Sequence, residues 1–180
     1  MKKFMVRSLA GSFLLGLTLS ACELFNKLDD VTFDVTLPLD FVIDEQLVSQ
    51  NPVVYSDVAI LDATDDPEVA KYKDKIREIR LNKITYEISN FAAPGAVSFT
   101  NGSLKLASGE TLVTASSIPL QNTAETELTS TNPAGFNAFA ADILGDKQVG
   151  VNLDGTFSET PVAFTLTARF YVTITADALK

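Results

Sequence analysis

Histidine is absent from this 180-residue sequence, and its absence limits the chemistry that the chain can perform. Histidine is the usual base of a Ser or Cys catalytic triad and the commonest zinc ligand. The sequence also shows no phosphate-binding or dinucleotide-binding glycine motif. Carboxylates remain, and a glycosidase needs only two of them, about 5–10 Å apart. Most acidic residues fall on expected outer faces or loops, however, and no pair stands out. We therefore expect a protein that is not an enzyme, with a glycosidase-like hydrolase using a carboxylate pair as the alternative.

The densest group of side-chain oxygens lies in the segment LDATDDPE, at residues 61–68. Calcium takes six to eight oxygen ligands, so Asp62, Asp65 and Asp66 are the calcium candidates. Their spacing differs from that of an EF-hand loop. Asp66 also stands directly before Pro67, in the position of a helix cap. We favour capping and solubility over calcium binding, and we expect no other cofactor.

Aromatic side chains on an outer face are the second kind of candidate, because carbohydrates bind on exposed rings. The chain has no tryptophan, so Tyr55 and Tyr171 are the candidates for ligand binding. Tyr171 falls on the expected outer face of the last strand, among threonines. A tyrosine in that position also packs against neighbouring strands, which is the alternative explanation.

Cys22 is the only cysteine, and its position within the first 22 residues is informative. Lys2, Lys3 and Arg7 precede an apolar run over residues 9–19, which is the order of a secretory signal. The run is too short to cross a bilayer, which takes about 20 residues. The signal ends in Leu19-Ser20-Ala21-Cys22, which resembles the lipobox of bacterial lipoproteins. The alternative is an ordinary signal peptide with an incidental cysteine.

The resemblance to bacterial lipoproteins implies cleavage before Cys22 and a diacylglyceryl and acylated cysteine as the membrane anchor. Anchoring by several acyl chains is effectively permanent, since each buried methylene adds about 0.8 kcal/mol. In lipoproteins of the enteric type, aspartate after the cysteine marks inner-membrane retention. Glu23 stands there instead, which favours the outer membrane. Acidic residues after the cysteine also serve as a surface-export signal in some bacteria, so the periplasmic and surface faces both stay open.

Charge narrows the classes of partner. Residues 1–21 hold three cations and no acid, so the remaining chain carries 11 Lys plus Arg against 23 Asp plus Glu, a net charge of −12. This field repels phosphate backbones and anionic headgroups. We expect no nucleic-acid binding, and contact with the membrane through the N-terminal lipid alone. The expected partner is another envelope protein or a glycan.

Alternation with period two predicts that most of the body is β-strand. The clearest run covers residues 31–44, and Pro38 within it indicates an edge strand or a bend. The residues expected to face inward on this run are Val31, Phe33, Val35, Leu37, Leu39, Phe41 and Ile43. Further strands are expected at 53–60, 81–91, 111–118 and 162–176, and residues 121–131 form either a loop or a weak strand.

Two short helices are expected, at about 66–78 and 133–144. The first begins after Asp66, and its apolar stripe would include Val69 and Ile76. The second begins at Asn132-Pro133 and would stop at Gly145.

Two dipeptides predict tight β-hairpins, because Asn-Gly and Asp-Gly tolerate the positive φ angles of a type I′ turn. They are Asn101-Gly102 and Asp154-Gly155.

These elements predict a mainly β protein built as an antiparallel β-sandwich, of Greek-key or jelly-roll type. The expected organisation is a signal peptide at 1–21, a polar tether at 22–30 and a single sandwich domain at 31–180. The overall expectation is a lipid-anchored cell-envelope lipoprotein that acts as a non-catalytic binding or structural module.

Overall fold

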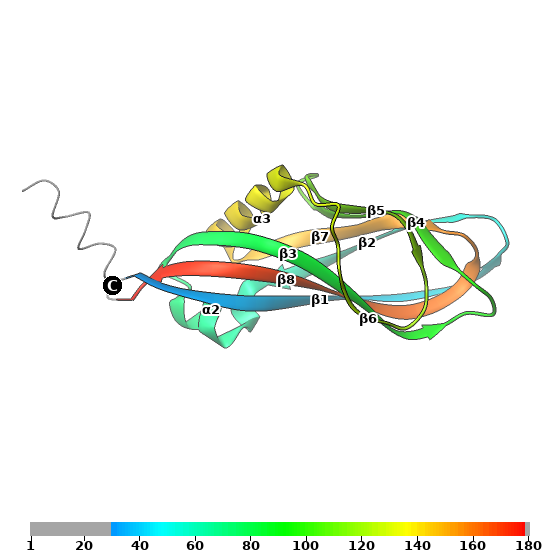
Figure 1. Ribbon diagram of the computed structural model, residues 1–180, viewed down its shortest axis with the longest axis horizontal. Coiled ribbons are helices and arrows are strands. Elements are labelled where there is room, and N and C mark those ends of the chain that lie inside the picture. The colour runs from blue at the N-terminus through cyan, green and yellow to red at the C-terminus, as the bar shows by residue number, and fades with distance from the viewer. Residues whose placement is uncertain (1–29, 179–180) are drawn as a thin grey trace, which may run out of the picture.

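The computed structural model describes residues 30–178, which form two antiparallel four-stranded sheets packed face to face (Figure 1). Sheet A has the order β1-β8-β3-β6, and sheet B has the order β2-β7-β4-β5. The strands of sheet A are β1 (Asp30–Ser49), β8 (Thr160–Asp177), β3 (Ile76–Ala92) and β6 (Thr123–Glu127). Those of sheet B are β2 (Val53–Asp62), β7 (Gln148–Phe157), β4 (Ser98–Leu106) and β5 (Thr111–Pro119).

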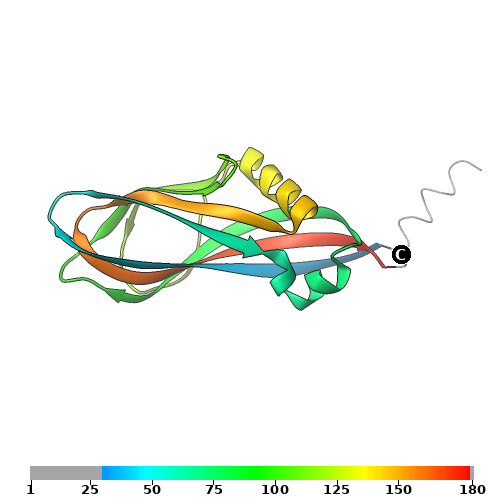
Figure 2. The same ribbon diagram turned by 180° about the vertical axis from the view of Figure 1, so that it is seen from behind.

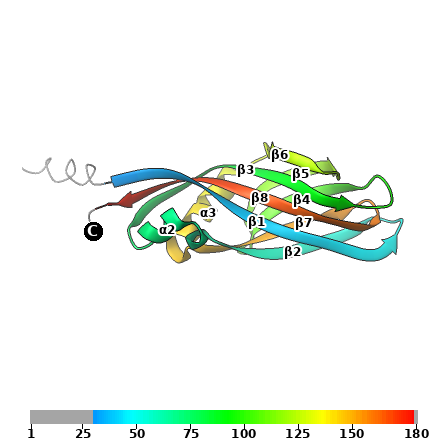
Figure 3. The ribbon, with the colours of Figure 1, turned by 90° about the horizontal axis from the view of Figure 1, so that it is seen from below.

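The strand pairing is nested along the chain: β1 pairs with β8, β2 with β7, β3 with β6 and β4 with β5. Successive pairs alternate between the two sheets, which is the jelly-roll arrangement of two Greek keys. The expected antiparallel β-sandwich is therefore confirmed. Because β1 ends sheet A and β2 ends sheet B, both sheets have an open edge on the side of the β1–β2 connection (Figure 3).

Long strands make the body elongated. β1 has 20 residues, and at about 3.3 Å per residue it is roughly 65 Å long. Asp30 lies opposite Asp177 at one end of the body, and Arg77 forms ion pairs with both carboxylates. The β1–β2 turn lies at the other end (Figure 1). We call the end with Asp30 the proximal end and the end with the turn the distal end.

Inward side chains of both sheets form one apolar core. The alternation expected in 31–44 is confirmed from Val35 to Ile43, where every odd-numbered residue is buried. Phe157 lies at the centre of an aromatic group, with ring centroids 5.2 Å from Tyr55, 5.0 Å from Phe99 and 6.1 Å from Phe164. Pro38 lies on an edge strand, as its missing amide predicts.

Helix α3 (Pro133–Asp146) packs in the proximal half against β3, β5 and β7 (Figures 1 and 2). Asn132 caps it, since its side-chain oxygen accepts a hydrogen bond from the Ala134 amide at 3.1 Å. Phe139 and Ile143, on the side of the helix that faces the sheets, are fully buried. The predicted stop at Gly145 is two residues early, because the helix runs to Asp146 and its C-cap is Lys147, whose φ of 63° is left-handed.

The first predicted helix is too long. The structure has a short 3₁₀ turn (Ala63–Asp65) followed by α2 (Pro67–Tyr72), and β3 already begins at Ile76. Ile76, expected in the helical stripe, instead lies in β3 opposite Ala176 of β8. Its spacing of seven residues from Val69 fits a helix, but the pairing with β8 overrides that local preference.

Both predicted hairpin turns are wrong. Asn101-Gly102 lies within β4 and Asp154-Gly155 lies within β7. Asn101 does have a positive φ, of 50°, but it serves a β-bulge between Thr100 and Ser103. Gly155 is required by packing, since a Cβ there would lie 2.1 Å from the Phe99 ring. The β4–β5 hairpin instead turns at residues 107–110.

Candidate functional site

Two of the three calcium candidates, Asp62 and Asp66, serve as capping groups. Asp62 Oδ1 accepts hydrogen bonds from the Thr64 amide at 2.8 Å and the Thr64 hydroxyl at 2.6 Å. These bonds, with a third from Gln148, lower the pKa of Asp62. Asp66 Oδ1 accepts from the Glu68 and Val69 amides at 2.9 and 3.1 Å and so caps α2. Asp65 is exposed. Within residues 30–178, no group of three or more His, Cys, Asp or Glu side chains has the geometry of a metal site.

Tyr55 offers no exposed ring. It faces the core between the sheets, is 9% exposed and packs against Phe157. Its hydroxyl donates to Asp57 Oδ2 at 3.4 Å. Burial and the nearby Asp57 carboxylate raise the pKa of Tyr55 far above its ordinary value of 10.0. Tyr55 is a core residue, and the expectation that it forms a binding platform has no support in this geometry.

Tyr171 does lie on the outer face of sheet A, as the alternation predicts. Its hydroxyl donates to Glu125 Oε1, and this bond raises the pKa of Tyr171. Glu125 also accepts from the Thr85 hydroxyl at 2.7 Å, and the two bonds lower the pKa of Glu125. Lys83 Nζ lies 4.3 Å from the centroid of the Tyr171 ring. The ring is therefore covered by a cation and tied to β6, which fits cross-strand packing better than an open sugar platform.

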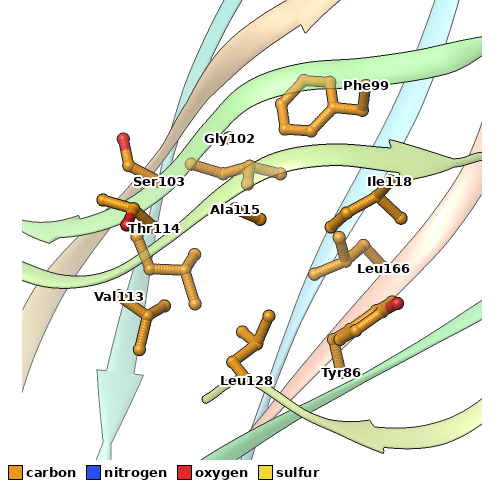
Figure 4. Close-up of a pocket in the computed structure, with 12 residues that line it drawn as sticks. Tyr86, Phe99, Gly102, Ser103, Val113, Thr114, Ala115, Ile118, Leu128 and Leu166 are labelled. Atoms are coloured by element: carbon orange, nitrogen blue, oxygen red, sulfur yellow. The ribbon is translucent and has the colours of Figure 1, made fainter. Parts of the chain in front are cut away.

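An apolar cavity lies between the sheets near β5 and β6 (Figure 4). Its volume is about 30 Å³, and the side chains around it include those of Tyr86, Leu128 and Leu166. This volume is close to that of a single water molecule in the liquid. The cavity is a packing gap on the scale of one small group, too small for an organic ligand without movement of β6.

Large apolar side chains are exposed along β1, β2 and the turn between them. Val42 projects from the outer face of sheet A, Leu47 and Val48 lie near the turn, and Val54, Val58 and Ile60 project from the outer face of sheet B, so all six lie along one edge of the sandwich. Exposed apolar residues gathered in one region mark contact surfaces. We call this edge the β1–β2 apolar surface. Its members are Val42, Leu47, Val48, Val54, Val58 and Ile60, each between 59% and 83% exposed.

The β1–β2 apolar surface lies in acidic surroundings. Between Asp30 and Asp62 the chain has seven carboxylates and no Lys or Arg. Those within two residues of its members are Asp40, Asp44, Glu45, Asp57 and Asp62. Along the described chain the first cation is Lys71, on α2 in the proximal half. In space, Arg77 pairs with Asp30, and Lys105 pairs with Asp154 beside β2. The surface therefore combines exposed apolar side chains with an excess of negative charge.

Sequence reasoning missed this surface, although a signal was present. The run VVYSDVAI at residues 53–60 is apolar on both faces, with Val54, Val58 and Ile60 on one and Val53, Tyr55 and Ala59 on the other. Only one face of an outer strand can pack on the core, so the second apolar face must be exposed. The run was interpreted merely as a weaker strand.

The carboxyl pKa values that are shifted within the described residues are all lowered. Apart from Asp62 and Glu125, the shifted ones are Asp154 and Glu110, and the pKa of each lies below its ordinary value. A general acid needs a raised pKa. Asp177 is the buried carboxylate within residues 30–178, and it forms an ion pair with Arg77. None of the described helices has the length and apolar character needed to cross a bilayer.

Comparison with known proteins gives no family. No family model matches the chain, and no curated protein matches it. Among solved structures, the chain is similar to the decameric BFDV capsid protein, with 13% identity, a TM-score of 0.45 and coverage of 81% of this chain and 98% of that chain. It is also similar to a chain of Desmodium yellow mottle tymovirus, with 11% identity, a TM-score of 0.39 and coverage of 100% and 91%.

Proposed function

We propose that this protein is a lipid-anchored lipoprotein of the bacterial outer membrane that acts as a non-catalytic binding module. The lipobox resemblance at Leu19–Cys22, which lies outside the described residues, supports the anchor. The observation that carries the binding role is the β1–β2 apolar surface, because a monomer gains nothing from exposing six large apolar side chains along one edge of the sandwich.

The elongated body suits this role. The tether would join the sandwich at Asp30, at the proximal end, while Leu47, Val48 and Val54 adjoin the turn at the distal end. A module anchored in this way holds its apolar surface away from the lipid, where another envelope protein can reach it. The strongly acidic charge keeps the body itself off anionic headgroups.

Fractionation of bacterial cells tests the anchor. The wild-type chain is expected in the outer-membrane fraction, with mass spectrometry showing an acylated Cys22 at the mature N-terminus. Cys22→Ser should leave the protein unprocessed and should change its membrane fractionation. An unchanged distribution would disprove the anchor.

Site-specific photo-crosslinking in intact cells tests the binding role. A photoreactive residue at Val48, on the β1–β2 apolar surface, should give a discrete adduct. The matched control is a photoreactive residue at Asn137, which is exposed on α3. Adducts of equal yield at both positions, or at neither, would argue against a dedicated contact surface on β1 and β2.

A further inference from the structure

The edge of β2 has open backbone groups. β2 pairs with β7 on one side and ends sheet B on the other. The Val58 amide donates to the Asp57 carboxylate at 2.8 Å and thus points away from β7. Backbone groups alternate in direction along a strand, so the amides of Val54, Ser56 and Ile60 point to the same open edge. These groups can pair with an added strand.

The side chains beside this edge suit such an addition. Val54, Val58 and Ile60 project from the outer face of sheet B and are 81%, 59% and 70% exposed. Side chains directly across a strand pair lie about 4.5–5.5 Å apart. A strand laid along β2 with its own apolar residues on that face would cover all three.

The β1 edge differs from the β2 edge in a way that identifies the docking strand. Natural edge strands are protected from pairing by proline and by charges. β1 has Pro38, and its outward positions include Asp34, Asp40 and Asp44. β2 has two carboxylates: Asp57 covers a single amide, and Asp62 at the end of the strand accepts from the Thr64 amide of the following turn. Of the two edges on this side of the sandwich, β2 is the one left able to accept a strand.

Charge indicates what kind of strand would bind. The segment from Asp30 to Asp62 contains carboxylates and no cation, so an acidic strand is repelled there. Pairing with a second copy of β2 would bring two Asp57 side chains onto one shared edge. A segment that alternates apolar residues with Lys or Arg matches both the apolar side chains and the negative charge.

We propose that β2 binds an extended basic segment of a partner protein, alternating apolar and Lys or Arg residues, as a fifth strand of sheet B. The proposal rests on the binding role of the β1–β2 apolar surface and specifies its partner. Main-chain hydrogen bonds supply part of the affinity, and the charge supplies specificity.

The first test uses a fluorescent octapeptide of alternating Lys and Val with the purified full-length protein, followed by fluorescence anisotropy. Binding is expected, and it should weaken as salt is raised. The same peptide methylated on its backbone amides, and a Glu-Val octapeptide, should each bind at least tenfold more weakly. Equal binding of the methylated peptide would overturn strand pairing, and equal binding of the Glu-Val peptide would overturn the charge argument.

The second test uses a matched pair of proline variants. Val58→Pro removes an amide that points to the open edge, so the ladder with β7 should survive and peptide binding should fall at least tenfold. Thr36→Pro is the control, since Thr36 is exposed, lies two residues from Pro38 on the β1 edge with the same backbone direction, and is outside the β1–β2 apolar surface. Circular dichroism must show the wild-type sheet signal for both. Wild-type binding by Val58→Pro would overturn the proposal.

Two further results would also decide against the proposal. The first is a failure of the Lys-Val peptide to bind at all. The second is a dimer, seen by sedimentation, that Val58→Pro dissociates, which would identify a second copy as the occupant. Failure of the proposed binding role can be told apart from failure of the strand proposal, because only the former removes the crosslinked adduct at Val48 in cells. An adduct at Val48 that persists in Val58→Pro would preserve the binding role and exclude the strand mode.

Discussion

The ring of Phe139 on α3 stacks on the ring of Phe170 on β8, with centroids 5.1 Å apart and an angle of 3° between the planes. Both rings are fully buried. Phe170 belongs to β8, a central strand of sheet A. The stacked pair therefore holds α3 against a strand that follows it by about 30 residues in the sequence. Gly135 makes the close approach possible on the other side, since a Cβ there would lie 2.1 Å from the Thr111 carbonyl oxygen of β5.

Phe139→Ala should lower the free energy of unfolding by about 3–5 kcal/mol, because it removes a buried ring and leaves a cavity. Urea denaturation measures this change. Phe136→Ala is the control, since Phe136 is on the same helix but only partly buried. Equal losses for the two variants would show that the stack does not hold α3 in place.

Gly155→Ala should destabilise the sandwich by about 1–3 kcal/mol, because the new methyl group would overlap the Phe99 ring. Gly145→Ala is the matched control: a Cβ at Gly145 meets nothing within 4 Å, so alanine should stabilise α3 by about 0.5–1 kcal/mol. Thermal unfolding distinguishes the two. Phe99→Leu should relieve part of the Gly155→Ala loss, and a purely additive double variant would contradict the overlap.

Stability should fall in acid partly through Asp154. Hydrogen bonds from the Ser56 hydroxyl at 2.6 Å and from Lys105 Nζ at 3.0 Å lower its pKa below the ordinary 3.8. A carboxyl whose pKa is lowered by folding contributes stability above its unfolded pKa and loses it as pH falls through the folded pKa. Asp154→Asn should therefore flatten the loss of unfolding free energy below about pH 4. In Ser56→Ala, the NMR titration midpoint of Asp154 should rise, and an unchanged midpoint would contradict this explanation.

Stability should also fall in alkali, through Tyr55. Burial of the phenol raises its pKa, so the folded state favours the neutral form. The contribution is complete below the unfolded pKa of about 10 and is lost as pH rises beyond it. Tyr55→Phe should reduce the dependence of unfolding free energy on pH above 10. Tyr171→Phe is the comparison, because Tyr171 lies on the outer face, and its effect should be smaller.

Local patterns in the sequence predict the strands better than their connections. Alternation from Val35 to Ile43 identifies a strand because each side chain has one of two destinations, the core or the solvent. The Asn101-Gly102 signal is equally local, but a bulge and a turn both need the same positive φ. Only the long-range register with β7 distinguishes them. The nested pairing of β1 with β8 spans the whole domain, and no short segment encodes it.

Candidate sites were harder to predict than strands. The prediction that Asp66 caps a helix is confirmed, because a cap depends only on the residues next to it. Tyr55 and Tyr171 have similar sequence surroundings but opposite environments, since one packs on Phe157 and the other hydrogen-bonds Glu125. The β1–β2 apolar surface depends on which strands become sheet edges, and that follows from topology.

Arg77 bridges Asp30 and Asp177, so the two chain termini of the sandwich leave from the same end. A reporter fused beyond Asp177 would therefore emerge roughly 65 Å from the loop at residues 50–52. An antibody epitope inserted between Asn51 and Pro52 would stand at the opposite extremity and disturb no ladder. If the proposed outer-membrane anchoring holds, staining of unpermeabilised bacteria that carry such an insertion would tell whether the protein lies on the surface face or the periplasmic face.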